Sequence, residues 1–211
     1  MPPSTTERTS TGIPAQDPAT APRSERGLGV LLLAGGLIGL VAAVVLLVEK
    51  IALLANPDYI PSCNVSPVLS SGSVMTTPQA EAFGIPNPIL GIAGFAVVAA
   101  IGVGLLAGAR FAGWFWAGVQ GGVTFAVVFL HWLMYQSLYV IGALCPYCMI
   151  VWAVTIPIFW HVTIRNLRVR STERGTSSRF LEYRGAILTA WFLTIIALIA
   201  VRFWDYWTTL L

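Results

Sequence analysis

The sequence predicts an all-α, polytopic membrane protein, and its composition and its long apolar runs predict this class. Of the 211 residues, 56% are hydrophobic and only 10% are charged, whereas soluble domains carry about 25% charged residues. The mean hydropathy is +0.78. The small net charge of +3 is segregated along the chain. It therefore indicates membrane topology and not nucleic-acid binding.

Five apolar stretches are each close to the roughly 20 residues that a helix needs to cross a bilayer. We expect transmembrane helices at 28–48, 89–108, 114–134, 143–163 and 185–204. Before them, residues 1–26 are rich in Ser, Thr, Pro and Ala and predict a disordered cytoplasmic tail. Residues 164–184 are expected to form a basic cytoplasmic loop. Residues 185–211 are then the fifth helix and an external C-terminus.

The basic residues are distributed unevenly between the two sides of these helices. Ten of the twelve fall in the tail and in the loops after the second and fourth spans, and Lys50 and Arg202 fall on the other side. Because cytoplasmic loops carry the excess of Lys and Arg, we expect a cytoplasmic N-terminus in a bacterial inner membrane. The C-terminus and residues 49–88 would then lie outside, in an oxidising space.

A CxxC motif, Cys145-Pro146-Tyr147-Cys148, stands where the fourth span begins. Two cysteines at this spacing can form and break a disulfide, and a helix N-terminus stabilises the first one as a thiolate. Pro146 suits the first helical position, where its missing N–H costs nothing. The motif therefore predicts thiol redox chemistry at a membrane surface. A structural disulfide or half of a zinc site is the alternative.

The first external loop, at 49–88, is long and contains the third cysteine, Cys63. Loops of this length are usually functional or disordered, and its many apolar residues favour a cap that lies over the helices. We expect a short helix after the start signal at 76–78. An odd cysteine in an oxidising space indicates an intermolecular disulfide, a reactive thiol or an altered partner position.

These motifs together resemble the vitamin K epoxide reductase family. The resemblance is carried by Cys63, by the segment Val68-Leu69-Ser70-Ser71-Gly72-Ser73-Val74-Met75, by Phe83-Gly84-Ile85-Pro86-Asn87-Pro88 and by the CPYC motif. The bacterial, actinobacterial-type branch is the most similar in pattern. The resemblance covers roughly residues 28–163 and implies a four-helix bundle over 27–163, with the fifth helix outside the shared core.

The resemblance also implies a path for electrons. In the family, two loop cysteines take electrons from a secreted thioredoxin-like disulfide oxidase and pass them to the CxxC. The CxxC then reduces a quinone of the menaquinone or ubiquinone type, without a metal. Sensitivity to vitamin K antagonists such as warfarin is implied as well. Cys63 matches the first loop cysteine, but the second falls on Ser71, whose hydroxyl cannot join a disulfide.

We interpret Ser71 as a Cys-to-Ser change that traps one state, and a naturally divergent member of the family is the alternative. By the same resemblance, Cys145 would bond to the loop thiol and Cys148, one turn deeper, would face the quinone.

Three further positions match quinone-site positions of the family. Asn87 resembles a donor to the quinone carbonyl, although Asn is also common in turns. Thr77 falls near a family hydroxyl, although it could equally be the N-cap before Pro78. Trp152 lies one turn beyond Cys148 and could pack on the quinone face, or else pack in the core or against lipid.

His131, in the middle of the third span, could carry protons toward the quinone or could hydrogen-bond a neighbouring helix. A metal-handling membrane protein is an alternative function, in which Cys63, Cys145 and Cys148 would bind copper(I) or zinc. The unrelated quinone-dependent disulfide-bond oxidases of bacteria are closer in function but lack the FGxPNP pattern.

Overall fold

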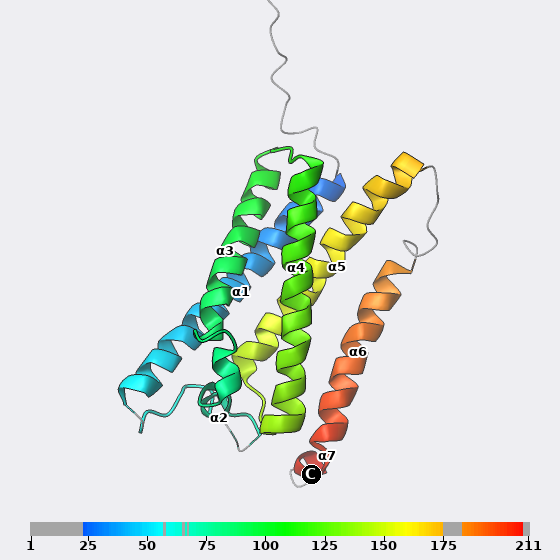
Figure 1. Ribbon diagram of the computed structural model, residues 1–211. Helices are drawn as coiled ribbons and strands as arrows, with labels where there is room; N and C mark the ends of the chain where they lie inside the picture. The colour runs from blue at the N-terminus through cyan, green and yellow to red at the C-terminus, as the bar shows by residue number, and fades with distance from the viewer. Residues whose placement is uncertain (1–22, 57, 65, 67, 175–182, 209–211) are drawn as a thin grey trace, which may run out of the picture.

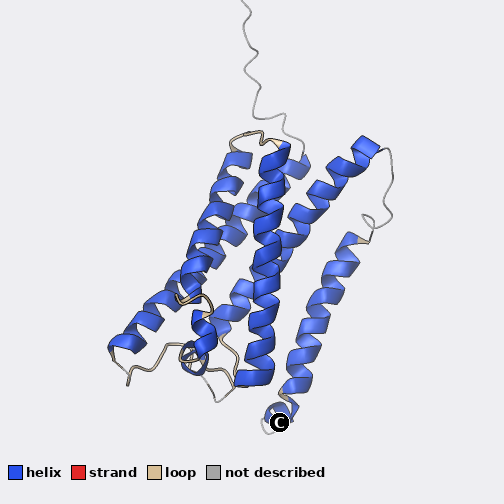
Figure 2. Cartoon of the chain, viewed as in Figure 1, coloured by secondary structure: helices blue, strands red, loops and turns tan. Residues whose placement is uncertain are grey.

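The computed structural model describes residues 23–56, 58–64, 66, 68–174 and 183–208. Every long element within these residues is a helix (Figures 1 and 2). Five are long and apolar enough to cross a membrane. They are α1 (Arg23–Ala55), α3 (Asn87–Leu106), α4 (Gly113–Tyr135), α5 (Pro146–Arg174) and α6 (Arg184–Arg202). The predicted fold class, an all-helical polytopic membrane bundle, is confirmed.

Four short elements complete the described chain. In the first external loop, α2 (Ser71–Met75) is followed by the 3₁₀ turn η2 (Pro78–Glu81). The latter is the short helix that the start signal at 76–78 predicts. A π-helical turn, η3 (Gln136–Ile141), extends α4, and α7 (Trp204–Thr208) follows α6.

Helix boundaries differ from the expectation on the tail side of the bundle. Residues 23–26 belong to α1 and not to the tail, and α5 continues to Arg174 into the expected basic loop. The two extensions support one another, because Arg165 pairs with Glu25 at 3.3 Å and lies over the Trp116 ring. The rest of the expected tail (1–22) and of the loop (175–182) lies outside the described residues.

The fourth span begins three residues later than expected, at Pro146 and not at 143. The preceding residues are extended, because Leu144 forms a parallel bridge with Leu69 of the external loop. Leu144 donates its N–H to the Val68 carbonyl at 2.7 Å, and its own carbonyl accepts from Ser70 at 3.0 Å. Cys145 therefore precedes the helix instead of lying within it.

Helices α1 and α3 approach each other closely at glycines. A Cβ added to Gly102 would lie 2.5 Å from the backbone nitrogen of Leu33, and one added to Gly36 would lie 2.7 Å from that of Ala99. Small residues allow membrane helices to pack closely, and these two glycines do so. Gly94 does not, since an added Cβ there would meet nothing within 4 Å.

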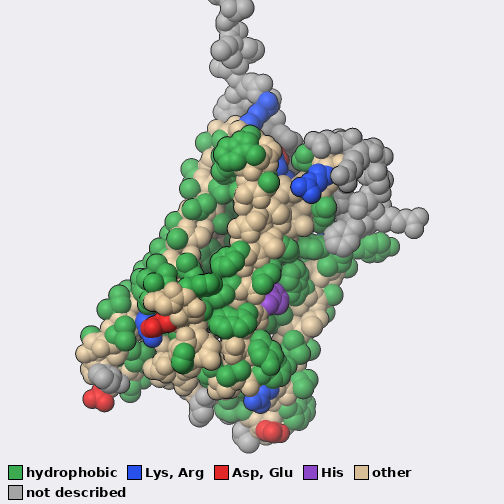
Figure 3. All heavy atoms as spheres, viewed as in Figure 1, with side chains coloured by type: hydrophobic (Ala, Val, Ile, Leu, Met, Phe, Trp, Pro, Cys, Tyr) green, Lys and Arg blue, Asp and Glu red, His purple; other side chains and the backbone are tan. Residues whose placement is uncertain are grey.

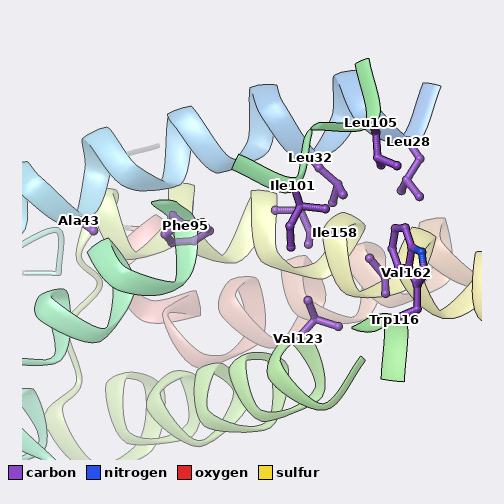
Figure 4. Packing of buried hydrophobic residues seen from close by; sticks show 10 residues of the cluster. All are labelled: Leu28, Leu32, Ala43, Phe95, Ile101, Leu105, Trp116, Val123, Ile158 and Val162. Carbon is purple, nitrogen blue, oxygen red and sulfur yellow. The ribbon is translucent and has the colours of Figure 1, made fainter. Parts of the chain in front are cut away.

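Side chains from four helices converge in the inner core. Leu32 of α1, Ile101 of α3, Trp116 of α4 and Ile158 of α5 are all buried in it (Figure 4). A second cluster, nearer the external loop, includes Leu138, Leu144 and Trp152. The site described below lies against this second cluster.

The helix α6 stands at the edge of the bundle (Figure 1) and is held to it at three heights. The Trp160 indole donates to the Arg184 carbonyl at 3.0 Å. The Trp191 indole donates to His131 Nε2 at 3.1 Å, and Arg202 Nε donates to the Leu138 carbonyl at 2.9 Å.

The external loop, the start of α5 and the end of α6 gather at one end of the bundle (Figure 1). The α3–α4 connection and the start of α1 lie at the other. On the face seen in Figure 3, charged side chains gather toward these two ends and apolar ones cover the length between them. This arrangement fits a multi-pass membrane protein.

Candidate redox site

Cys145 occupies the position just before the first residue of α5, where it caps the helix. Its sulfur accepts the N–H of Cys148 at 3.4 Å, and its carbonyl accepts that of Met149 at 3.0 Å. The first N–H groups of a helix lack partners within the helix, so a sulfur at this position finds donors that are already aimed at it. The side chain is buried, with only 1% of the residue exposed.

Ser71 lies directly against Cys145. The Ser71 hydroxyl donates to the Cys145 sulfur at 3.3 Å, and Ser71 is completely buried. It is the first residue of α2, whose N-cap, Ser70, accepts the N–H of Ser73 at 3.2 Å. The bridge between Leu69 and Leu144 fixes this approach. The position at which the family resemblance predicts a second loop cysteine thus contacts the first cysteine of the CxxC.

These donors change the acidity of Cys145. Hydrogen bonding from the Cys148 side chain, assisted by the Ser71 hydroxyl and by the backbone N–H groups of Cys148 and Tyr147, lowers the pKa of the Cys145 thiol to about 7. Burial opposes this effect, because it disfavours the charged form. Near neutral pH a substantial fraction of Cys145 is therefore the nucleophilic thiolate.

Cys63 lies on the other side of the motif, beside Tyr147. Its side chain interacts with the Tyr147 hydroxyl, which is 3.4 Å from the hydroxyl of Ser62. The next residue, Asn64, accepts from both Gly72 N–H, at 3.0 Å, and the Ser70 hydroxyl, at 3.1 Å. The residues that flank Cys63 and Ser71 are therefore in direct contact.

The three cysteines are free thiols in this structure. The Cys145–Cys148 disulfide that an oxidising space predicts stays a prediction for the oxidised protein.

Two charged residues at the end of α1 hold the external loop, and the sequence reasoning did not identify them. Glu49 accepts both the N–H of Ser62, at 3.0 Å, and the Ser62 hydroxyl. Lys50 donates to the Met75 carbonyl at 2.7 Å and pairs with Glu81 at 3.0 Å. Glu49 and Lys50 are only 4% and 8% exposed. Two adjacent charges near the end of an apolar span were a sign that both residues bind partners in the loop, because buried charges need partners.

A cavity of about 250 Å³ opens beside this anchor. It is lined by Lys50, Leu53, Leu54, Met75 and Thr76. Met75 also packs in the small cluster that holds Cys145, with Cys148 partly buried against it. Met75 therefore links the cavity to the apolar cluster that holds the redox sulfurs.

The comparison with known families decides what this site belongs to. The sequence model of the vitamin K epoxide reductase family matches residues 30–163, which is more than half of the 211 residues. The chain belongs to the vitamin K epoxide reductase family. Members of this family are membrane thiol oxidoreductases. No curated protein sequence matches the chain.

The match includes all three cysteines and Ser71 and leaves α6 outside. Within it, Asn87 lies at the start of α3 with its side chain turned toward the loop. Asn87 Nδ2 donates to the Gln79 carbonyl at 2.7 Å, and Oδ1 accepts from Ala82 N–H at 3.1 Å. Within the described part of the chain the second amide hydrogen makes no bond, and the quinone contact suggested by the family stays a prediction.

Trp152 is placed in its more ordinary role, in the core, whereas the Thr77 hydroxyl neither caps η2 nor is placed against a quinone. Thr77 is the residue before η2, but its hydroxyl donates to the Val74 carbonyl at 2.8 Å and makes no capping bond. Trp152 is 6% exposed and packs in the second cluster, which Cys148 also borders. A quinone contact by either residue stays a prediction.

His131 hydrogen-bonds a neighbouring helix, which is the second of the two roles considered for it. Its Nδ1 lies 2.7 Å from the Val127 carbonyl, and its Nε2 accepts from Trp191. Since a carbonyl only accepts, Nδ1 carries the proton. Among the described residues, no three His, Cys, Asp or Glu side chains gather as metal ligands would, so the metal-handling alternative gains no support.

Proposed function

We propose that this membrane thiol oxidoreductase takes electrons from a secreted thioredoxin-like partner and delivers them to a quinone, supporting disulfide formation outside a bacterial inner membrane. The observation that carries the proposal is the 3.3 Å contact between the Ser71 hydroxyl and the Cys145 sulfur. A cysteine at position 71 would bring its sulfur to the sulfur that a loop thiol must attack.

The proposed relay has three exchanges, each of two electrons and two protons. The partner dithiol is oxidised to a disulfide as it reduces a disulfide between Cys63 and a cysteine at position 71. The thiolate at position 71 then attacks Cys145, which forms a mixed disulfide and releases the Cys148 thiolate. Cys63 attacks the sulfur at position 71, which re-forms the loop disulfide and leaves Cys145 and Cys148 as the dithiol. Finally, the Cys145–Cys148 dithiol is reoxidised as the electrons leave for the quinone.

The residues at the site suit an apolar two-electron acceptor. Cys148 borders apolar clusters on two sides, and α5 opens toward the lipid at the exposed Ile150. When bound, a quinone supplies the electron sink and becomes the quinol. Asn87 has one free amide hydrogen with which to orient its carbonyl. Inhibition by vitamin K antagonists such as warfarin is part of the same proposal.

We further propose that Ser71 interrupts this relay, either as an introduced Cys-to-Ser change or as natural divergence. In this chain, Cys145 and Cys148 should form a disulfide when oxidised, and Cys63 should stay free or bond to a second chain. Mass spectrometry of non-reduced peptides checks this expectation. A predominant Cys63–Cys145 bridge would contradict it.

The activity test compares this chain with the Ser71→Cys variant in quinone-containing bilayers. With a thioredoxin-like dithiol protein as donor, we expect the Ser71 chain to be nearly inactive and the variant to turn over. A small dithiol should reduce quinone through either chain, because it can reduce the Cys145–Cys148 disulfide without a loop thiol. Equal rates with the protein donor would refute the relay role of position 71, and a Cys148→Ser variant is the inactive control.

A further inference from the structure

Helix α6 lies outside the region that matches the family, yet its outer end packs close to the redox site. Arg202, the last residue of α6, donates from Nε to the carbonyl of Leu138 at 2.9 Å. Leu138 is in the π-helical turn that ends α4 and is 1% exposed. A guanidinium at the carbonyl end of a helix is favourable both as a hydrogen-bond donor and as a positive charge.

The geometry of the turn explains why the Leu138 carbonyl is available. The chain closes at Gly142, whose φ is +71°, a left-handed conformation typical of glycine after a helix. The N–H groups of Gly142 and Ala143 both donate to the Ser137 carbonyl, at 3.0 and 3.2 Å. In a continued π-helix, the Ala143 N–H would donate to the Leu138 carbonyl. That N–H is bonded to Ser137 instead, and Arg202 donates to Leu138 in its place.

A short, rigid path leads from this contact to the redox sulfur. The Ser137 hydroxyl donates to the Ala143 carbonyl, and Leu144 is bridged to the external loop. Leu138 and Leu144 are both 1% exposed and share one buried cluster with Phe203 of the chain that follows α6. A shift of the turn would therefore act on Cys145 through residues 142–144 and strain the bridge that sets Cys145 against Ser71.

We propose that Arg202 is a positioning residue for the redox site: it caps the end of α4 at Leu138 and so holds residues 142–145 where Cys145 meets Ser71. Helix α6, the fifth membrane helix, is then part of the redox machinery. The importance of Cys145 for turnover rests on the proposed function. The position of the Cys145 sulfur does not depend on the proposed function and can be measured separately.

The acidity of Cys145 is a suitable readout because it depends on the donors around the sulfur. The titratable neighbours from α5 are Cys148 and Tyr147. From α1, Glu49 reaches the motif through Ser62, and Lys50 reaches it through the Met75 carbonyl. None of these residues is changed in the variants below.

The test uses the reduced full-length chain in lipid nanodiscs. Tandem mass spectrometry follows the reaction of Cys145 with iodoacetamide between about pH 5 and 10, and the midpoint is read from the pH profile. The variants are Arg202→Met, the milder Arg202→Gln, and Arg202→Lys, which restores a positive donor. Trp191→Phe is the matched control, because it removes the other side-chain bond between α6 and α4 at a distance from the turn.

The parent chain should show a midpoint of about 7. Arg202→Met should raise it by about one pH unit, roughly the effect of losing one hydrogen bond to the thiolate. Arg202→Gln should raise it less, and Arg202→Lys should return it toward the parent value. Trp191→Phe should lower the melting temperature and leave the midpoint unchanged.

Profiles of Arg202→Met and Arg202→Gln that superimpose on the parent would overturn the proposal, and so would an equal shift in Trp191→Phe. If Arg202→Met is not recovered folded, the Gln and Lys pair carries the same comparison. A shifted midpoint together with an inactive Ser71→Cys chain would refute the proposed function and leave the positioning role standing.

Discussion

The reactivity of Cys145 is set by atoms that come from two segments of the chain, the start of α5 and the external loop. Its helix supplies backbone N–H groups, Cys148 supplies a side-chain donor, and the external loop supplies the Ser71 hydroxyl. Together they outweigh burial, which would favour the neutral thiol. Ser71, which cannot take part in thiol exchange, thus still stabilises the thiolate form of reduced Cys145.

Replacing Ser71 by Ala should raise the pKa of Cys145 above about 7. The hydroxyl stabilises the thiolate, so its loss favours the thiol and lowers the thiolate fraction at and below neutral pH. A hydrogen bond of about 1 kcal/mol corresponds to somewhat less than one pKa unit. Alkylation of Cys145 at pH 6 should therefore slow about fivefold.

The neighbouring Ser70→Ala change removes a hydroxyl that does not contact the sulfur and is the control. An unchanged profile in Ser71→Ala would mean that the hydroxyl does not act on Cys145.

Burial of the Glu49 carboxylate costs free energy, which its bonds to the external loop must offset. Its Oε2 is buried and has no hydrogen-bond partner among the described residues, whereas Oε1 accepts two bonds from Ser62. Leaving a buried polar atom unpaired costs about 1–3 kcal/mol. The two bonds to the residue before Cys63 indicate that the carboxylate is retained to hold that cysteine over the motif.

Glu49→Ala should release the segment around Cys63 and lower the melting temperature, because two bonds worth about 1 kcal/mol each are lost. Glu49→Gln keeps an acceptor oxygen and should preserve most of the stability. Melting of the purified chain in detergent and the rate of Cys63 labelling check both variants. Glu81→Gln is the matched control, since that side chain is 42% exposed and surface ion pairs contribute little. Equal melting of Glu49→Ala and the parent would remove the anchor role.

What the sequence could predict about single residues follows from how local each signal is. The CxxC at 145–148 and the mismatch at Ser71 are read directly from spacing. The contact of Ser71 with Cys145 depends on a bridge between residues 75 positions apart in the chain, and only the family resemblance implied it. Nothing local showed that Asn87 turns to Gln79 or that Glu49 holds Ser62, because both partners lie across loops.

Helices were predicted well where apolar length alone determines them and less well where other contacts do. All five spanning helices occur, since a bilayer-length apolar run has few alternatives. The five-residue α2 was not expected, because Ser71–Met75 is too short to show a helical period. The π-turn at Gln136–Ile141 was missed as well, since its form depends on the closure at Gly142 and on Arg202.

The close approach of α1 and α3 should make Gly102 intolerant of even one methyl group. In Gly102→Ala the new Cβ would lie 2.5 Å from the Leu33 nitrogen and 2.9 Å from the Gly29 carbonyl oxygen. Backbone cannot yield as a flexible side chain can, so the helices must separate, and overpacking of this kind costs about 1–3 kcal/mol. The melting temperature in detergent should fall.

Gly94→Ala, on the same helix, is the matched control. An added Cβ there meets nothing within 4 Å, and alanine is favoured over glycine inside a helix by about 0.5–1 kcal/mol. The two variants should therefore shift the melting temperature in opposite directions. A rise in both would show that α1 and α3 are not in contact at Gly102.

At the level of the entire molecule, the distribution of charge and the placement of the site agree with one topology. The external loop, the start of α5 and α7 share one end of the bundle, whereas the start of α1, the α3–α4 connection and the end of α5 lie toward the other (Figure 1). A thiol relay that accepts electrons from a secreted partner needs its cysteines on the outside. The excess of Lys and Arg at the opposite end favours that end as cytoplasmic.

We therefore expect reporter fusions to separate the two ends of the protein. Alkaline phosphatase, which is active only after export, should be active when fused after Leu211 and inactive when inserted in the loop between α3 and α4. A cytoplasmically folding fluorescent protein should give the reverse pattern.

In intact cells, a membrane-impermeant maleimide should label Cys63, which is partly exposed, after mild reduction. Because ten of the twelve basic residues act in one direction, replacing Arg110 alone should not invert the chain. An exported reporter in the α3–α4 loop would place the redox site in the cytoplasm. Such a result would exclude a secreted electron donor while leaving the thiol chemistry of Cys145 intact.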